Sequence, residues 1–157
     1  MSGRFDYAKV APDANEAMRG LERYVRGSGL ERSLIELVKI RASQLNGCAY
    51  CLDMHTKDAR AAGESEQRLY VLAAWREAPF YSERERAALE WTEALTVLAR
   101  DGVPDELYER TRRVFSELEL VNLTTAIIAI NGWNRLSVAF RSPEPRRRRG
   151  DPARNER

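Results

Sequence analysis

Reactive side chains are scarce in this chain, and long apolar runs are missing. Its 157 residues include two cysteines and one histidine. No segment approaches the run of about 20 apolar residues that a membrane-spanning helix requires, and the longest apolar run, Ala126–Ile130, is typical of a buried helix. The N-terminal residues also lack the apolar stretch of a signal peptide. We therefore expect a cytoplasmic protein whose thiols are kept reduced and which has no membrane partner.

A large excess of charge of one sign is also lacking, because 26 Lys and Arg residues nearly balance 24 Asp and Glu residues. The net charge of +2 is too small to indicate a nucleic-acid partner, and much of it comes from Arg146–Arg149. From residue 142 onward the sequence is rich in Pro, Arg, Glu, Asp and Gly and offers little to bury. We predict a domain over residues 1–141 and a disordered, solvated tail over residues 142–157.

The alternation of apolar and polar residues that marks β-strands is missing, whereas helical periodicity recurs along the chain. Ser82 with Glu85, and Ser116 with Glu119, form the capping-box pattern that begins a helix. Gly132 is expected to bend the last helix. These signals predict an all-α, compact domain of about seven helices, over residues 14–26, 31–46, 48–62, 65–79, 82–100, from 104 onward, and 116–140.

Both cysteines and the single histidine lie within eight residues, at Cys48, Cys51 and His55. Gly47 ends the preceding segment and helix-favouring residues follow, so a helix should begin at about Cys48. Residues 48, 51 and 55 then share one helix face. Unpaired N–H groups at a helix N-terminus stabilise a thiolate, and the two-residue spacing allows a disulfide to close. The cluster therefore predicts a redox site, in which one thiol attacks and the other resolves the product.

His55 follows Cys51 by one helical turn and could accept its proton. A histidine in this role usually needs an orienting partner, and Glu36 is the best candidate. It stands in the apolar stretch Ser33–Val38, and an antiparallel return at Gly47 would bring it against the middle of the cysteine helix. A carboxylate on that buried side requires a partner. A solvent-facing glutamate on an amphipathic helix is the alternative.

The spacing of these four residues resembles the signature of the AhpD-like alkylhydroperoxidases, in the carboxymuconolactone decarboxylase superfamily. Glu36 is followed by eleven residues, the Cys48-x-x-Cys51 pair, three residues and His55. Two further segments, Leu37–Gly47 and Ala129–Leu136, are similar to the small single-domain members of the family. The resemblance covers roughly residues 10 to 141 and leaves out the arginine-rich tail.

The resemblance implies a peroxidase cycle with no cofactor beyond a redox-active disulfide. Cys51 would be the peroxidatic cysteine and attack a hydroperoxide, and Cys48 would resolve the sulfenic acid as a disulfide. Glu36 and His55 would form a proton relay. An external dithiol or thioredoxin-type donor would then reduce the disulfide. Family members typically form trimers or hexamers, so we expect a homo-oligomer, with Trp75, Trp91 and Trp133 either at its interface or in the core.

One position departs from the best-known peroxidase of the family, which has a second histidine where this chain has Tyr50. A tyrosine can donate a hydrogen bond, but its pKa near 10 prevents it from shuttling protons at neutral pH. A thiol-disulfide oxidoreductase or redox sensor that uses the same residues is therefore an open alternative. A zinc site built from the two cysteines, His55 and Glu36 is another. A decarboxylase and an inert helical domain with packed cysteines complete the alternatives.

Overall fold

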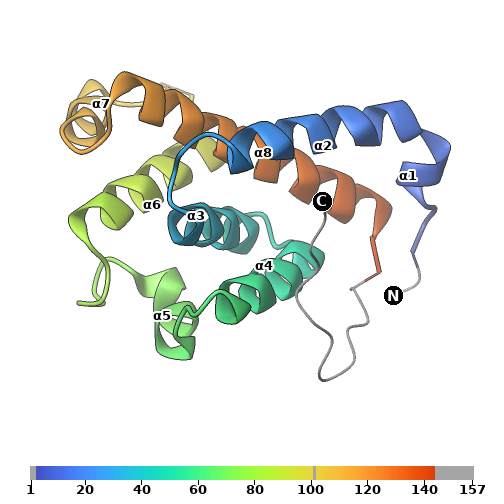
Figure 1. Cartoon of the computed structure of the whole chain (residues 1–157), viewed down its shortest axis with the longest axis horizontal. Coiled ribbons are helices and arrows are strands. Elements are labelled where there is room, and N and C mark those ends of the chain that lie inside the picture. The colour runs from blue at the N-terminus through green and yellow to red at the C-terminus, as the bar shows by residue number, and fades with distance from the viewer. Residues whose placement is uncertain (1–2, 101, 144–157) are drawn as a thin grey trace.

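The computed structural model describes residues 3–100 and 102–143, and within these ranges it contains helices and no strand. The predicted all-α fold is therefore confirmed (Figure 1). The chain order of the elements is α1 (Tyr7–Val10), α2 (Pro12–Arg26), α3 (Arg32–Leu45), α4 (Ala49–Ala61), α5 (Glu66–Val71), the 3-10 helix η1 (Leu72–Ala74), α6 (Glu83–Thr96), α7 (Asp105–Arg112) and α8 (Glu117–Phe140). Of the predicted disordered tail, residues 144–157 lie outside the described residues.

Several helix boundaries differ from the prediction. The short helix α1 was not expected; the side chain of Asp6 caps it by accepting a hydrogen bond from the Ala8 N–H at 3.1 Å. Helix α2 begins at Pro12, because a proline is well tolerated in the first helical turn. Helix α6 ends at Thr96 rather than near residue 100, since the backbone of Val97 leaves the helical conformation with φ −111° and ψ 59°. Local propensity alone did not reveal that early end.

The two predicted capping boxes are both present. The Ser82 hydroxyl accepts from the Glu85 N–H and the Glu85 carboxylate accepts from the Ser82 N–H, which begins α6. Ser116 and Glu119 repeat this exchange at the start of α8. Each box satisfies backbone donors that the first helical turn leaves unpaired.

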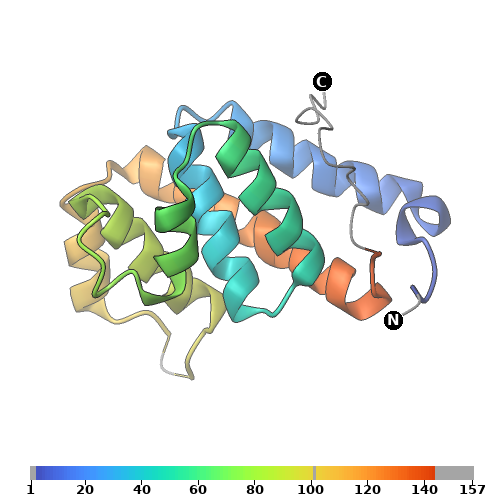
Figure 2. The same cartoon turned by 90° about the horizontal axis from the view of Figure 1, so that it is seen from below.

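Helix α3 lies at the centre of the molecule and packs against α4, α6 and α8 (Figures 1 and 2). It buries residues on more than one face, because neighbours surround it. The side chains of Trp75 and Trp91 are buried within this single chain. They therefore belong to the intramolecular core, which was one of the two predicted locations, and Trp133 is half-buried.

Helix α8 runs without interruption through Gly132. A Cβ atom at that position would lie 2.7 Å from the Met18 side chain, so the glycine lets α2 approach α8 closely. Among the described residues, no helix taken singly has the length and apolar character needed to cross a membrane. Helices α7 and α8 satisfy that criterion as a pair, although they meet at an angle of 118°.

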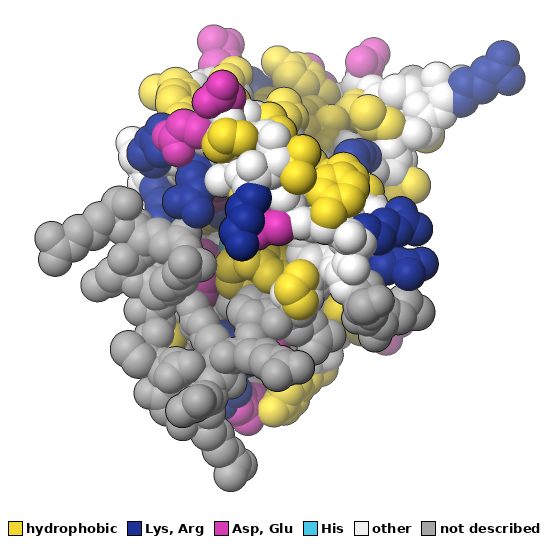
Figure 3. All heavy atoms as spheres, turned by 90° about the vertical axis from the view of Figure 1, so that its right-hand side faces the viewer, with side chains coloured by type: hydrophobic (Ala, Val, Ile, Leu, Met, Phe, Trp, Pro, Cys, Tyr) yellow, Lys and Arg dark blue, Asp and Glu magenta, His cyan; other side chains and the backbone are white. Residues whose placement is uncertain are grey.

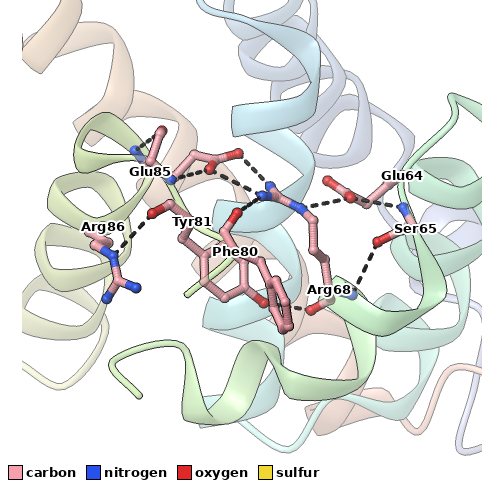
Figure 4. Close-up of polar contacts among 8 residues, drawn as sticks. Glu64, Ser65, Arg68, Phe80, Tyr81, Glu85 and Arg86 are labelled. Carbon is pink, nitrogen blue, oxygen red and sulfur yellow. Dashed lines mark hydrogen bonds and ion pairs between the residues drawn. The ribbon is translucent and has the colours of Figure 1, made fainter. Parts of the chain in front are cut away.

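The turn after α4 is anchored to α6 by Arg68 (Figure 4). Its guanidinium group lies between two carboxylates, 2.9 Å from Glu64 and 2.5 Å from Glu85. It also donates to the carbonyl oxygen of Phe80, and the Tyr81 hydroxyl donates to the carbonyl of Arg68 itself at 2.5 Å. This network fixes the position of α5 and thereby the C-terminal end of α4.

Candidate functional site

The cysteine pair lies at the turn between α3 and α4. Gly47 has a positive φ of 62°, which favours glycine and reverses the chain direction after α3. Cys48 is the N-cap residue of α4, with an extended backbone conformation, and Cys51 lies in the first turn. The predicted helix thus begins one residue after Cys48, and both thiols are at its N-terminus as expected.

Both cysteines are reduced in this structure and only 1% exposed. They belong to an apolar cluster with Ala42 of α3 and Ile130 of α8, against which Tyr50 and Trp133 pack. The thiols are therefore enclosed where three helices meet, and Tyr50 packs beside them. A substrate can reach the sulfur atoms only if some of these side chains move.

The two thiols act on each other electrostatically. Hydrogen bonding from the Cys51 thiol lowers the pKa of Cys48 to about 6, although burial acts in the opposite direction. The pKa of Cys51 is raised, because the thiol holds its proton next to the Cys48 thiolate and is buried. The two shifts together favour a thiolate on Cys48 and a protonated thiol on Cys51.

His55 and Glu36 are brought together as the sequence predicted. His55 Nδ1 lies 2.8 Å from Glu36 Oε2, and both side chains are largely buried. Burial alone would raise the pKa of Glu36, but the hydrogen bond and the charge of His55 lower it. The lowered pKa keeps the carboxylate ionised, so it accepts a hydrogen bond from Nδ1–H, and Nε2 is the ring nitrogen that does not face Glu36. The histidine lies one turn after Cys51 on α4.

Three residues near the thiols were missed by sequence reasoning. Ser137 Oγ is 4.0 Å from Cys51 Sγ. Asn134, one turn earlier on α8, lowers the pKa of both cysteines by hydrogen bonding. Tyr7 of α1 interacts with Tyr50 and Cys51, and burial is the main reason that its own pKa is raised. Asn134 lies in a segment that carries the family resemblance, whereas nothing in the local sequence singles out Tyr7.

A pocket of about 150 Å³ opens on the other side of the His55–Glu36 pair. Its lining residues are Ser33, Glu36, Ala59, Ala62, Gly63 and Glu64. Neither cysteine lines it, and Ala59 lies two helical turns beyond Cys51. Among the side chains that the structure describes, no group of three or more His, Cys, Asp or Glu residues is arranged to hold a metal ion.

Comparison with known proteins places this chain in a family. The pattern of the carboxymuconolactone decarboxylase family matches residues 11–94, which is more than half of the chain and includes Glu36, both cysteines and His55. The chain belongs to this family. The AhpD-like resemblance of the sequence is thereby confirmed at the level of the family, while the roles of the four residues are not tested by it.

Two relatives extend the match over most of the chain. The uncharacterized protein YdfG of Bacillus subtilis is 50% identical over 140 residues, covering 89% of this chain and 95% of the relative. A structure from Agrobacterium tumefaciens, of a protein of unknown function proposed to be the antioxidant defence protein AhpD, has a TM-score of 0.89 and 49% identity, and covers 93% of this chain and 100% of its own.

A more distant structural neighbour in the comparison is the debrominase Bmp8. It has a TM-score of 0.77 at 21% identity, with 88% of this chain and 74% of that chain covered. At this identity the likeness shows a shared fold alone.

Proposed function

We propose that this protein is a thiol-dependent peroxidase that reduces hydroperoxides through a Cys48–Cys51 dithiol cycle. The observation that carries the proposal is the buried thiol pair at the N-terminus of α4, on the same helix as a histidine that Glu36 holds at 2.8 Å. The family membership and the relative proposed to act in antioxidant defence support the same chemistry.

In the proposed cycle the thiolate form of Cys51 attacks the terminal oxygen of a hydroperoxide. The O–O bond breaks, an alcohol leaves after it takes up one proton, and Cys51 becomes a sulfenic acid. Cys48 then attacks that sulfur, forming the disulfide and releasing water. The net reaction consumes one hydroperoxide and two thiol hydrogens. His55 accepts the proton of Cys51 at Nε2, and Glu36 stabilises the imidazolium that results.

Other parts of the proposal follow from this cycle. The disulfide must be reduced by an external dithiol or a thioredoxin-type donor, which returns both thiols. A cytoplasmic location is proposed because the resting thiols have to stay reduced. Tyr50 is proposed to pack over the pair and to donate a hydrogen bond, without a part in proton transfer at neutral pH.

A thiol-disulfide oxidoreductase is the second candidate, and one observation favours it. Cys48 is the first cysteine of the pair and the N-cap of α4, and its pKa of about 6 suits attack on a disulfide at neutral pH. In that case Cys48 would be the attacking thiol and Cys51 the resolving one.

A turnover assay separates the two candidates. Purified protein would be supplied with dihydrolipoamide or thioredoxin and given either an organic hydroperoxide or a small disulfide substrate. We expect hydroperoxide turnover that exceeds disulfide turnover and that is abolished in Cys51→Ser. The proposal would be contradicted if the protein reduced the disulfide substrate but reduced no hydroperoxide with either reductant.

A further inference from the structure

Helix α8 brings a hydroxyl group against the thiol pair, at Ser137. This side chain is buried, with 5% of its surface exposed. The Cys51 thiol donates a hydrogen bond to its Oγ, with 4.0 Å between the sulfur and the oxygen. The two residues are 86 positions apart in the sequence, so the contact joins the last turns of α8 to the first turn of α4.

Ser137 belongs to the face of α8 that covers the cysteines. Ile130, Asn134 and Ser137 follow one another at intervals of four and three residues, so they lie on one side of the helix. All three are buried, and Ile130 belongs to the same apolar cluster as both cysteines. The face is therefore apolar at Ile130 and carries a hydroxyl group at the turn that reaches Cys51.

The C-terminal end of α8 holds the backbone of Ser137 in place. The Ser142 N–H donates to the carbonyl oxygen of Ser137 at 3.0 Å, and the Arg141 N–H donates to that of Val138 at 3.4 Å. These two bonds close the last turn of the helix as in a Schellman motif. Arg141 adopts the left-handed conformation that this closure requires, with φ 52° and ψ 55°. Ser137 thus lies within a closed turn and not in a fraying helix end.

A hydroxyl group can serve both protonation states of a thiol, because it accepts and donates. While Cys51 is protonated, its S–H donates to Ser137 Oγ. Once that proton has left, the hydroxyl can rotate and donate to the thiolate. The second bond is the stronger one, because a thiol is a weak donor, whereas a hydrogen bond to a buried charge is strong. The hydroxyl therefore favours the thiolate over the thiol.

We propose that Ser137 is a positioning residue of the thiol site, which holds the Cys51 side chain toward α8 and donates to its thiolate. This inference deepens the proposed dithiol function, and it rests on that function only for the step in which the thiolate attacks. The competing role is packing alone, in which a small side chain lets α8 approach α4.

Other groups around the Cys51 sulfur also influence its charge. The hydrogen bond with Cys48 and burial raise the pKa of Cys51, and hydrogen bonds from Asn134 and Ser137 act in the opposite direction. The titratable groups around the site are Cys48, Tyr50 and His55 at α4, Glu36 of α3 and Tyr7 of α1. Ser137→Ala replaces none of these groups, and alanine is close to serine in size.

The test is a pH titration that follows the Cβ signal of isotope-labelled cysteine by NMR in the reduced full chain. This signal distinguishes a thiol from a thiolate, and no reagent has to enter the buried site. The background is Cys48→Ala, which leaves Cys51 as the one cysteine and removes the coupling to a second thiol. Adding Ser137→Ala should raise the midpoint by about one pH unit or more, which is about tenfold less thiolate relative to thiol below the midpoint.

Thr111→Val is the matched control in the same background. Thr111 is fully buried on α7, and its hydroxyl donates to the carbonyl oxygen of Leu107 at 2.8 Å. Valine keeps the shape of the side chain and removes the hydroxyl, so this variant should leave the Cys51 midpoint where it is. A midpoint that Ser137→Ala leaves unchanged, or that Thr111→Val raises by the same amount, would overturn the proposal.

Ser137→Thr separates the hydrogen bond from packing. Threonine keeps the hydroxyl and adds a methyl group, so the proposal predicts a midpoint close to that of Cys48→Ala alone. A midpoint as high as that of Ser137→Ala would instead assign the effect to packing. Alanine favours helices, so Ser137→Ala is expected to fold. No hydroperoxide enters the titration, and a wild-type protein that reduces no hydroperoxide would count against the proposed function alone.

Discussion

Individual side chains in this site depend on one another. The Cys51 thiol lowers the pKa of Cys48 by hydrogen bonding, and the neighbouring Cys48 together with burial raises the pKa of Cys51. His55 depends in turn on Glu36, at a distance of 2.8 Å. The reactivity of the pair is therefore a property of the cluster rather than of one cysteine.

Removing the charge of Glu36 tests the relay. In Glu36→Gln the amide cannot stabilise an imidazolium at His55, so we expect hydroperoxide-dependent oxidation at pH 7 to slow by about a hundredfold. The measurement is the rate of disulfide formation after rapid mixing with a hydroperoxide. Glu64→Gln is a suitable control, since Glu64 lines the same pocket but pairs with Arg68. Equal rates in wild type and Glu36→Gln would exclude a relay.

The same variant has a predictable effect on stability. The pKa of Glu36 is lowered from 4.5 in the folded protein by His55, so its ionised form stabilises the fold. The stabilisation is fully present above pH 4.5 and is lost as the pH falls through the lowered pKa. The difference in unfolding free energy between wild type and Glu36→Gln should therefore shrink on acidification, which urea unfolding at neutral and acidic pH can measure.

Much of the site was predictable from the sequence, because its main residues lie on two consecutive helices. The contact between Glu36 and His55 follows almost completely from the chain reversal at Gly47 and from the spacing of the two residues in the sequence. Asn134 and Tyr7 were not predictable in this way. They reach the thiols through the packing of α8 and α1, and local periodicity does not contain such long-range contacts.

Helices were predicted best where a capping signal marks their ends. The boxes at Ser82 and Ser116 located the starts of α6 and α8 correctly. The end of α6 at Thr96 was missed, because the apolar residues that follow, Val97 and Leu98, continue the helical pattern while remaining exposed. The short helix α1 has too few residues for a periodic signal, and its packing on α8 maintains it.

Helix α1 and the residues just before it pack against the last residue of α8 through aromatic contacts. The ring centroid of Phe140 lies 4.6 Å from that of Phe5 and 5.8 Å from that of Tyr7, and its carbonyl oxygen accepts from the Arg4 N–H at 3.0 Å. Tyr7 in turn interacts with Cys51. This segment is thus a candidate for the part that moves when a substrate enters.

Loosening α1 should expose the thiols. Phe140→Ala removes both ring contacts, so we expect faster alkylation of the cysteines by a neutral reagent at a fixed pH. Tyr108→Ala is the control, because its ring contacts Trp91 at 6.5 Å on a different helix pair. Alkylation of Phe140→Ala at the wild-type rate would show that α1 does not limit access.

The surface of the whole molecule suggests where copies of the chain would meet. On the face drawn in Figure 3, the hydrophobic side chains of described residues are interspersed with Lys and Arg. Along α8, by contrast, Leu118, Val121 and Ile128 form an apolar stripe at helical spacing, and each is more than half exposed. The stripe is where the proposed homo-oligomer would bury apolar surface.

A charge in the stripe should prevent assembly. Ile128→Glu places a carboxylate in the stripe. We expect this variant to sediment as a single chain of 18.0 kDa, and we expect wild type to have three or six times that mass. Sedimentation at several protein concentrations measures this, with Tyr70→Glu as the control, because Tyr70 is also exposed but lies on α5. A monomeric wild-type protein would contradict the predicted oligomer.

The central claim for the molecule is that its two cysteines reduce a hydroperoxide, with Cys51 reacting first. The most direct measurement is mass spectrometry after brief exposure of the reduced protein to one equivalent of hydroperoxide. The account predicts a Cys48–Cys51 disulfide in wild type and a sulfenic acid at Cys51 in Cys48→Ser. Thiols that stay intact in wild type would contradict this claim. So would an oxidised Cys48 in Cys51→Ser together with an unoxidised Cys51 in Cys48→Ser.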